Sequence, residues 1–260
     1  MQNSIRLVLI LVFALFSNVQ ISRAAGVTII THGYENGGGL PTWVSSMSEA
    51  IVARAGGQQN VAVYNMVLGE DSAGDPVVLI KSLSPASGSP IPTNTTTGEI
   101  IINVDWSDFS GGFDAGPIIG AMSTTYVAAA IVNALTNSVF QSASFSNITS
   151  PTGNPLVELP VHLIGHSRGG SLMAEIARLL GEDGIWVDQL TPLDPHPLNN
   201  NGDVDPFQEG TVDAPVAIYA NVIFADNYYE TTQLYPHGMF VNNATNEGPL
   251  VFDINDDTCH

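Results

Sequence analysis

The sequence predicts an α/β protein built on a mostly parallel central sheet with helices on both faces. Short apolar runs rich in β-branched residues alternate with longer stretches in which apolar residues recur at helical spacing. Strands separated by crossover helices pair in parallel, because each helix carries the chain back to the end where the next strand starts. A length of 260 residues, of which 44% are hydrophobic, suits one domain with a single core.

Each predicted element follows from a local pattern. β-branched or continuous apolar runs predict the strands, and apolar residues three or four apart predict the helices. The predicted strands are 26–34 with its closing turn, 60–67, 99–106, 159–167, 185–194, 215–225 and 249–254. The predicted helices are 40–57, 118–139 and 168–181. The stretch 82–98 is rich in Ser, Thr, Pro and Gly and is expected to be a surface loop.

Residues 1–25 are predicted to be a signal peptide. A short start with one positive charge precedes the apolar block 7–16, and Ser22-Arg23-Ala24 offers the small residues of a cleavage site. The block is too short to span a bilayer as a helix, which takes roughly 20 residues. We therefore expect a secreted or periplasmic protein of one domain, 26–260, with no stable membrane span after cleavage.

The net charge of −19 narrows the expected partners. The chain has 6 basic and 25 acidic residues, and such a field repels phosphate backbones and anionic membrane surfaces. Nucleic acid is therefore not an expected partner. Cys259 is the only cysteine, so no disulfide can form within the chain.

A candidate nucleophile lies in the stretch Gly165-His166-Ser167-Arg168-Gly169. It matches the pattern G-x-S-x-G between a predicted buried strand and a predicted helix, which is the context of a nucleophile elbow. A serine attacks only when a base takes its proton, an acid orients the base and N–H donors hold the oxyanion. We predict Ser167 as the nucleophile and the backbone N–H of Arg168 as one oxyanion donor.

Four motifs occur in order along the chain. They are THGY at 31–34, VDW at 104–106, HLIGHSRGG at 162–170 and LDPH at 193–196. Together they resemble the α/β-hydrolase superfamily, and within it the pancreatic-lipase-like branch of secreted lipases and phospholipases. The resemblance implies an α/β-hydrolase fold for the domain. It also implies a second oxyanion donor in the His-Gly turn, the backbone N–H of Tyr34, with His32 supporting that turn.

Two aspartates qualify as the acid of a triad. Asp194 closes the strand 185–194 in a Leu-Asp-Pro turn, where the resemblance places the acid. The prolines around this turn would hold its carboxylate rigidly. Asp226 follows the next predicted strand, where most other α/β-hydrolases carry theirs. We favour Asp194 and keep Asp226 as the alternative.

The base must follow the acid in the order serine, acid, histidine. His196 is too close to Asp194 in the chain, whereas His237 lies in a loop between predicted strands. His260 follows the last predicted strand, where the resemblance places the histidine, and it is favoured. It is also the last residue of the sequence, so its loop can fray. The domain is therefore C-terminally truncated, or the protein has lost full activity, or His237 is the base.

The predicted function is a secreted serine hydrolase of lipase or esterase type that cleaves small-molecule or lipid carboxylic esters. No metal or organic cofactor is implied. Residues 199–205, NNNGDVD, alternate oxygen ligands as calcium loops do but lack the EF-hand spacing, so a solvated turn is favoured over a calcium site. A peptidase or acyltransferase would use the same triad. Outside the enzymes, the alternative is a non-catalytic hydrolase-fold binding protein or an inactive fragment.

Overall fold

A computed structural model describes residues 26–35, 39–70, 78–86, 99–111, 121–200, 211–230 and 238–250. The predicted signal peptide lies outside these residues. The strands of the main sheet are β1 (Gly26–Thr31), β2 (Val61–Glu70), β3 (Val78–Pro85), β4 (Glu99–Asp105), β7 (Val161–His166), β8 (Val187–Leu193), β9 (Val222–Glu230) and β10 (Thr245–Leu250). The α-helices are α2 (Thr42–Arg54), α3 (Ser107–Ser110), α4 (Thr124–Thr136) and α5 (Arg168–Glu182). A small hairpin is formed by β5 (Val139–Gln141) and β6 (Asn147–Thr149).

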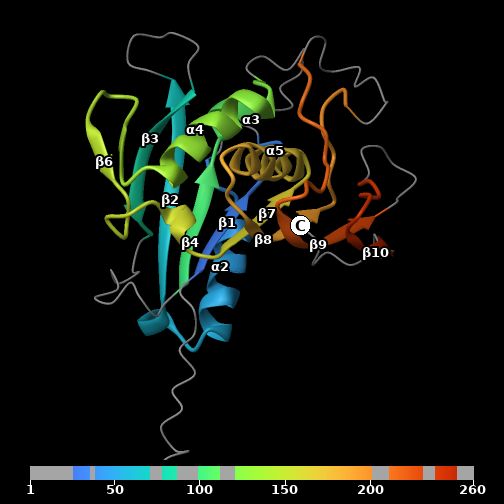
Figure 1. The fold of residues 1–260 in the computed structure, drawn as a ribbon, viewed down its shortest axis with the longest axis horizontal. Coiled ribbons are helices and arrows are strands. Elements are labelled where there is room, and N and C mark those ends of the chain that lie inside the picture. Colours follow the sequence, from blue (N-terminus) through green and yellow to red (C-terminus); the bar gives the residue numbers. More distant parts are fainter. Residues whose placement is uncertain are drawn as a thin grey trace, which may run out of the picture.

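The eight strands form one sheet in the order β10-β9-β8-β7-β1-β4-β2-β3 (Figure 1). Neighbouring strands are parallel except for β2 and β3, which pair antiparallel. The central strand β1 is buried along its whole length, as the continuous apolar runs of parallel strands require. The mostly parallel sheet expected from the sequence is therefore present.

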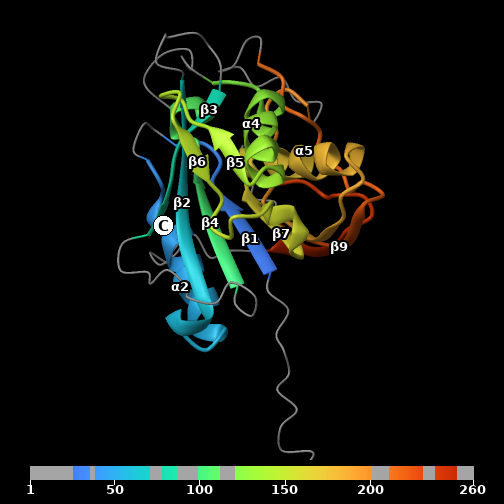
Figure 2. The same cartoon turned by 60° about the vertical axis from the view of Figure 1, so that its left-hand side comes forward.

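The helices lie on the two faces of this sheet (Figure 2). On one face, α4 and α5 pack against each other and their buried residues share the larger apolar cluster with Trp106. On the other face, α2 places Trp43, Val44 and Met47 against a second, smaller cluster that contains Ile30 and Ile164. Burial of these apolar side chains on both faces is the main favourable term for the fold, at about 25 cal/mol per Å².

The structure contradicts the predicted α/β-hydrolase fold. The described residues form a mostly β architecture, a mixed and mostly parallel eight-stranded sheet with four α-helices, of which α3 has only four residues. These helices are too few for an α/β-hydrolase fold. The sequence gives a reason, because the stretches around β9 and β10 are rich in Asn, Asp, Pro and Gly, which favour turns over helices.

Several predicted bounds were also wrong. The expected surface loop 82–98 begins inside β3, and β9 starts later and ends later than the predicted strand 215–225. Strand β10, in contrast, starts earlier than the predicted strand 249–254. The predicted helix 118–139 is observed only as α4, which ends before the hairpin of β5 and β6. In contrast, β7 and α5 lie almost where their patterns predicted them.

The order of the strands changes direction at β1. The chain first builds β4, β2 and β3 on one side of this strand and then returns to build β7, β8, β9 and β10 on its other side. The carboxyl ends of β1 and β7 lie side by side, because Thr31 at the end of β1 is in register with Gly165 near the end of β7. Ligands of open parallel sheets bind at such a switch point, beyond the carboxyl ends of the strands.

Candidate active site

Ser167 has a strained backbone at the turn between β7 and α5. Its φ of 55° and ψ of −124° are dihedrals that residues with a side chain rarely adopt, and such a conformation costs about 1–3 kcal/mol. Surrounding hydrogen bonds hold the residue in place: its N–H donates to Leu193 O at 2.9 Å, and its carbonyl accepts from the N–H of His196 at 3.1 Å. The side chain makes no capping bond to α5, although the residue occupies the N-cap position.

Glycines allow the elements around Ser167 to approach closely. A Cβ added at Gly165 would overlap the backbone carbonyl of Gly169 across the turn. A Cβ added at Gly33 would lie 2.6 Å from Ser167 Cβ and 2.9 Å from Ser167 Oγ. The turn that follows β1 therefore lies directly against the serine hydroxyl.

His32 holds this turn together. The residue is 1% exposed, and its Nδ1 lies 2.9 Å from Gly33 O. Its Nε2 accepts from the N–H of Trp106 at 3.3 Å, and Nδ1 donates to Gly33 O. The indole Nε1 of Trp106 donates in turn to His32 O at 2.8 Å. With both ring nitrogens engaged, His32 supports the loop that carries Tyr34, as expected from the sequence.

Asp194 follows β8 directly beside the elbow. Its φ is 46°, and its N–H donates to Tyr228 O at 2.5 Å. Its Oδ1 accepts from the backbone N–H of Glu230 at 2.9 Å. The neighbours of Asp194 in the chain are close to Ser167 as well, because Leu193 O and the N–H of His196 both bond the serine backbone. Asp194 and Ser167 thus both lie at the carboxyl ends of neighbouring strands, β8 and β7.

Asp226 occupies a different environment. It lies inside β9, which continues to Glu230, so it does not end its strand as the sequence reading expected. Its Oδ1 accepts from Thr191 Oγ1 at 2.6 Å and from Gln189 Nε2 at 3.1 Å. This carboxylate is thus engaged by side chains of β8 rather than by the elbow.

Both predicted bases, His260 and His237, lie outside the described residues. Gly238, which follows His237 in the chain, is described, and a Cβ added there would overlap Asp194 Oδ1. The backbone of Gly238 is therefore packed against the carboxylate of the favoured acid.

Two described histidines near the site have pKa values below the usual range because they are buried. Burial lowers the pKa of His166, the elbow residue before Ser167, although the nearby Asp194 carboxylate opposes this effect. The ring of Trp43 packs edge-on against it with 5.5 Å between the ring centroids. Burial also lowers the pKa of His162 to about 4, against the opposing charge of Asp226. Its Nε2 lies 3.0 Å from Thr191 Oγ1, so it is a satisfied residue of the strand.

The sequence reading missed one residue of this region, Asp213. Its carboxylate is buried and forms an ion pair with the side chain of Arg168, whose Nη2 lies 2.6 Å from Asp213 Oδ1. Sequence reasoning assigned Arg168 only a backbone role. Asp213 lies 45 residues further along the chain in a segment without periodicity, so no local pattern pointed to this pair.

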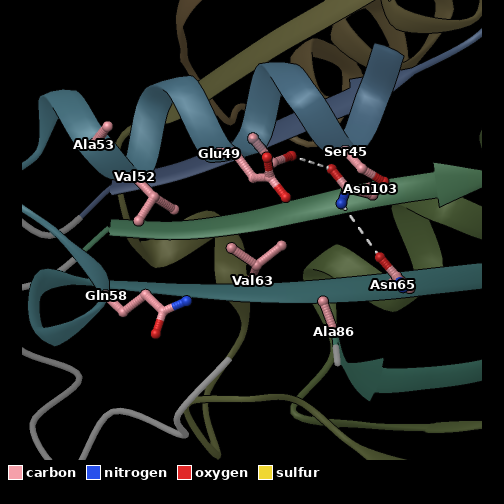
Figure 3. Close-up of a pocket in the computed structure, with 10 residues that line it drawn as sticks. Ser45, Glu49, Val52, Ala53, Gln58, Val63, Asn65, Ala86 and Asn103 are labelled. Atoms are coloured by element: carbon pink, nitrogen blue, oxygen red, sulfur yellow. Dashed lines mark hydrogen bonds between the residues drawn. The ribbon is translucent and has the colours of Figure 1, made fainter. Parts of the chain in front are cut away.

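A separate cavity of about 510 Å³ lies between α2 and the sheet (Figure 3). Hydrogen bonds across this cavity link the helix to the sheet: Ser48 Oγ donates to Asn103 Oδ1, and Asn103 Nδ2 donates to Asn65 Oδ1. Glu49, on α2, also lines the cavity. None of the predicted nucleophile, acids or oxyanion donors lines this cavity, so it contributes nothing to the site around Ser167.

The described residues bear on the predicted metal and membrane properties. Among them, no group of three or more His, Cys, Asp or Glu side chains is placed to hold a metal ion. Of the stretch 199–205, only Asn199 and Asn200 are described, and their amides donate to Thr211 O and Asp213 O. No helix in the described part of the chain is long and apolar enough to cross a membrane.

Comparison of the chain with protein-family models, with curated proteins and with solved structures found no match. The resemblance to secreted lipases therefore stays a prediction that rests on the motifs themselves.

Proposed function

We propose that this protein is a secreted serine hydrolase that cleaves carboxylic esters, with Ser167 as its nucleophile. The conformation of Ser167 carries the proposal: a strained serine heads a helix, beyond the carboxyl end of a parallel strand, at the switch point of the sheet. Strain of this kind persists only where the surrounding structure enforces it, and it is concentrated at functional sites.

The proposed roles follow from the residues around Ser167. Its Oγ forms a bond to the ester carbonyl carbon while its proton passes to a histidine that Asp194 orients. The N–H groups of Tyr34 and Arg168 hold the oxyanion, the C–O bond to the alcohol breaks, and the alcohol leaves with that proton. Water then attacks the acyl carbon, gives its proton to the histidine, and releases the carboxylic acid as Ser167 Oγ is protonated again.

For the base, we propose His260, which follows the last predicted strand, with His237 as the alternative. The order serine, acid, histidine is kept by either histidine. Separate His237→Ala and His260→Ala variants decide between the two histidines.

Charge supports a neutral or lipid ester as the substrate. The chain carries a net charge of −19, which repels anionic substrates and nucleic acid. The proposed chemistry needs no metal or organic cofactor, because the helix start and the backbone donors supply the positive potential at the oxyanion. Export of the chain is proposed on the N-terminal pattern of residues 1–25 alone.

The experiment is to react the protein with a fluorophosphonate probe and to measure hydrolysis of a short-chain nitrophenyl ester. Wild-type protein should be labelled once per chain, and Ser167→Ala should abolish both labelling and hydrolysis. Ser46→Ala, an exposed serine on α2, is the matched control and should react as the wild type does. A folded wild-type protein that neither reacts nor hydrolyses the ester would refute the proposal.

A further inference from the structure

The side chain of Arg168 is fully buried, although arginine normally keeps its charged group in water. Each of its three nitrogens donates at short distance. Nε donates to Asp213 Oδ2 at 2.7 Å, and Nη2 donates to Asp213 Oδ1 at 2.6 Å and to Met122 O at 2.7 Å. Nη1 donates to Ser110 O at 2.6 Å. One guanidinium therefore joins α5 to three other segments of the chain.

The partner carboxylate is equally well satisfied. Besides the two bonds from Arg168, Asp213 Oδ1 accepts from the N–H of Thr124 at the start of α4, at 3.1 Å. Asp213 Oδ2 accepts from the N–H of Leu198 at 2.9 Å. A buried ion pair is tolerated only when good geometry and further hydrogen bonds compensate for lost hydration, and this pair meets both conditions. The paired charges cancel, so the pair adds geometry rather than net charge next to the elbow.

The guanidinium also connects to the loop that carries the second oxyanion donor. It lies over the ring of Tyr34 at 5.6 Å and over the ring of Trp106 at 4.9 Å, both within the range of a cation–π contact. Ser110, whose carbonyl accepts from Arg168, also accepts through its Oγ from the N–H of Glu35 at 3.1 Å. Tyr34 and Glu35 are thus both linked to Arg168, the residue that follows the proposed nucleophile.

We propose that the Arg168–Asp213 pair fixes the spacing between the two oxyanion donors, the N–H groups of Tyr34 and Arg168. This inference rests on the proposed function, and Asp213 and the guanidinium of Arg168 are positioning residues in it. A planar group with donors in fixed directions suits this task, because it sets four contacts at once. Lysine carries the same charge but lacks this fork of donors.

A purely structural role gives a different expectation. Buried ion pairs can often be replaced by apolar residues of similar volume without loss of stability. If the pair only fills the core, the double variant Arg168→Met/Asp213→Leu should fold and hydrolyse the ester at the wild-type rate. If the pair positions the donors, the same variant should fold and lose turnover, because removing one oxyanion donor costs on the order of 10²–10³ in kcat.

The test measures kcat, KM and the rate of fluorophosphonate labelling for the wild type, Arg168→Met/Asp213→Leu and Arg168→Lys. Thermal melting followed by circular dichroism identifies the variants that fold. We expect a fall in kcat and in labelling rate of about 10- to 100-fold, with KM changed less than about threefold, because the donors act mainly in the transition state. Glu175→Gln breaks another ion pair of α5, that with Arg178, and should leave kcat unchanged.

The outcomes separate the two proposals. A reactive wild type with a folded double variant of unchanged kcat overturns this inference and leaves the proposed function intact. Should the double variant not fold, Arg168→Lys decides in its place, and wild-type turnover of that variant overturns the inference. An unreactive wild type refutes the proposed function, and this inference falls with it.

Discussion

Replacing Gly33 by alanine should lower turnover on the order of 10²-fold while the protein still folds. The φ of Gly33 lies outside the left-handed region, so the backbone itself accepts a side chain. The new Cβ would lie 2.6 Å from Ser167 Cβ and 2.9 Å from both Ser167 Oγ and His166 O. Non-bonded carbon atoms pack at about 3.5–4.0 Å, so the serine and the turn must separate by roughly 1 Å.

The size of both effects follows from that displacement. Overpacking of this kind costs typically about 1–3 kcal/mol of stability, which a folded domain can tolerate. A shift of about 1 Å at the reacting atoms can cost on the order of 10²-fold in rate. We therefore expect Gly33→Ala to lower kcat on an ester, and the rate of fluorophosphonate labelling, by about two orders of magnitude.

The matched control is Gly184→Ala, which separates lost stability from lost geometry. Gly184 has a φ of +73° with nothing within 4 Å of an added Cβ, so alanine strains the backbone there by about 1 kcal/mol without any clash. It should lower the melting temperature and leave kcat unchanged. Wild-type kcat in Gly33→Ala would show that the turn after β1 is not beside the reacting atom, and would refute the reasoning.

Three further predictions address the remaining groups. His260→Ala should abolish ester turnover whereas His237→Ala should retain it, and the reverse result in kinetic assays would assign the base to His237. Asp194→Asn should lower kcat by on the order of 10³-fold or more. Asp226→Asn should change kcat little, because Asp226 is engaged by Thr191 and Gln189. Equal losses of kcat in the two variants would contradict the choice of Asp194 as the acid. His162 binds a proton more readily in the unfolded than in the folded chain, because burial lowers its pKa to about 4. The free energy of unfolding should therefore fall as the pH drops from 6.5 to about 4, by up to about 3 kcal/mol. Urea unfolding of the wild type and of His162→Gln measures this, and an equal dependence of the free energy of unfolding on pH in the two proteins would exclude the prediction.

The parts of the fold that the sequence predicted well are those with strong local signals. The strand β7 and the helix α5 combine a continuous apolar run, a glycine-flanked serine and apolar residues at helical spacing, and both lie nearly where these patterns placed them. The hydrolase fold was wrong because alternation of strands and helices indicates a parallel sheet but not how many helices cover it. Strand β3 was missed because its second half already belongs to the polar stretch 82–98.

In the candidate site as well, some positions were predictable from local sequence signals and others were not. Ser167 and the turn after β1 were predictable because glycines mark both places where backbones meet. The interaction of Arg168 with Asp213 was not predictable, since it depends on how the segment after β8 returns to the start of α4. Such a long-range contact between two charged side chains leaves no periodic pattern in either segment.

The proposed function depends on the local geometry around Ser167 and does not require an α/β-hydrolase fold. The site requires a strand end that turns into a helix, a neighbouring strand end with a close backbone turn, and a third strand end that carries an acid. β7 with α5, β1 and β8 supply these three parts, and they are adjacent in the sheet regardless of how many helices cover it. Function depends on such local geometry rather than on the whole fold. The arrangement of Ser167, Gly33 and Asp194 should therefore decide whether this protein cleaves esters.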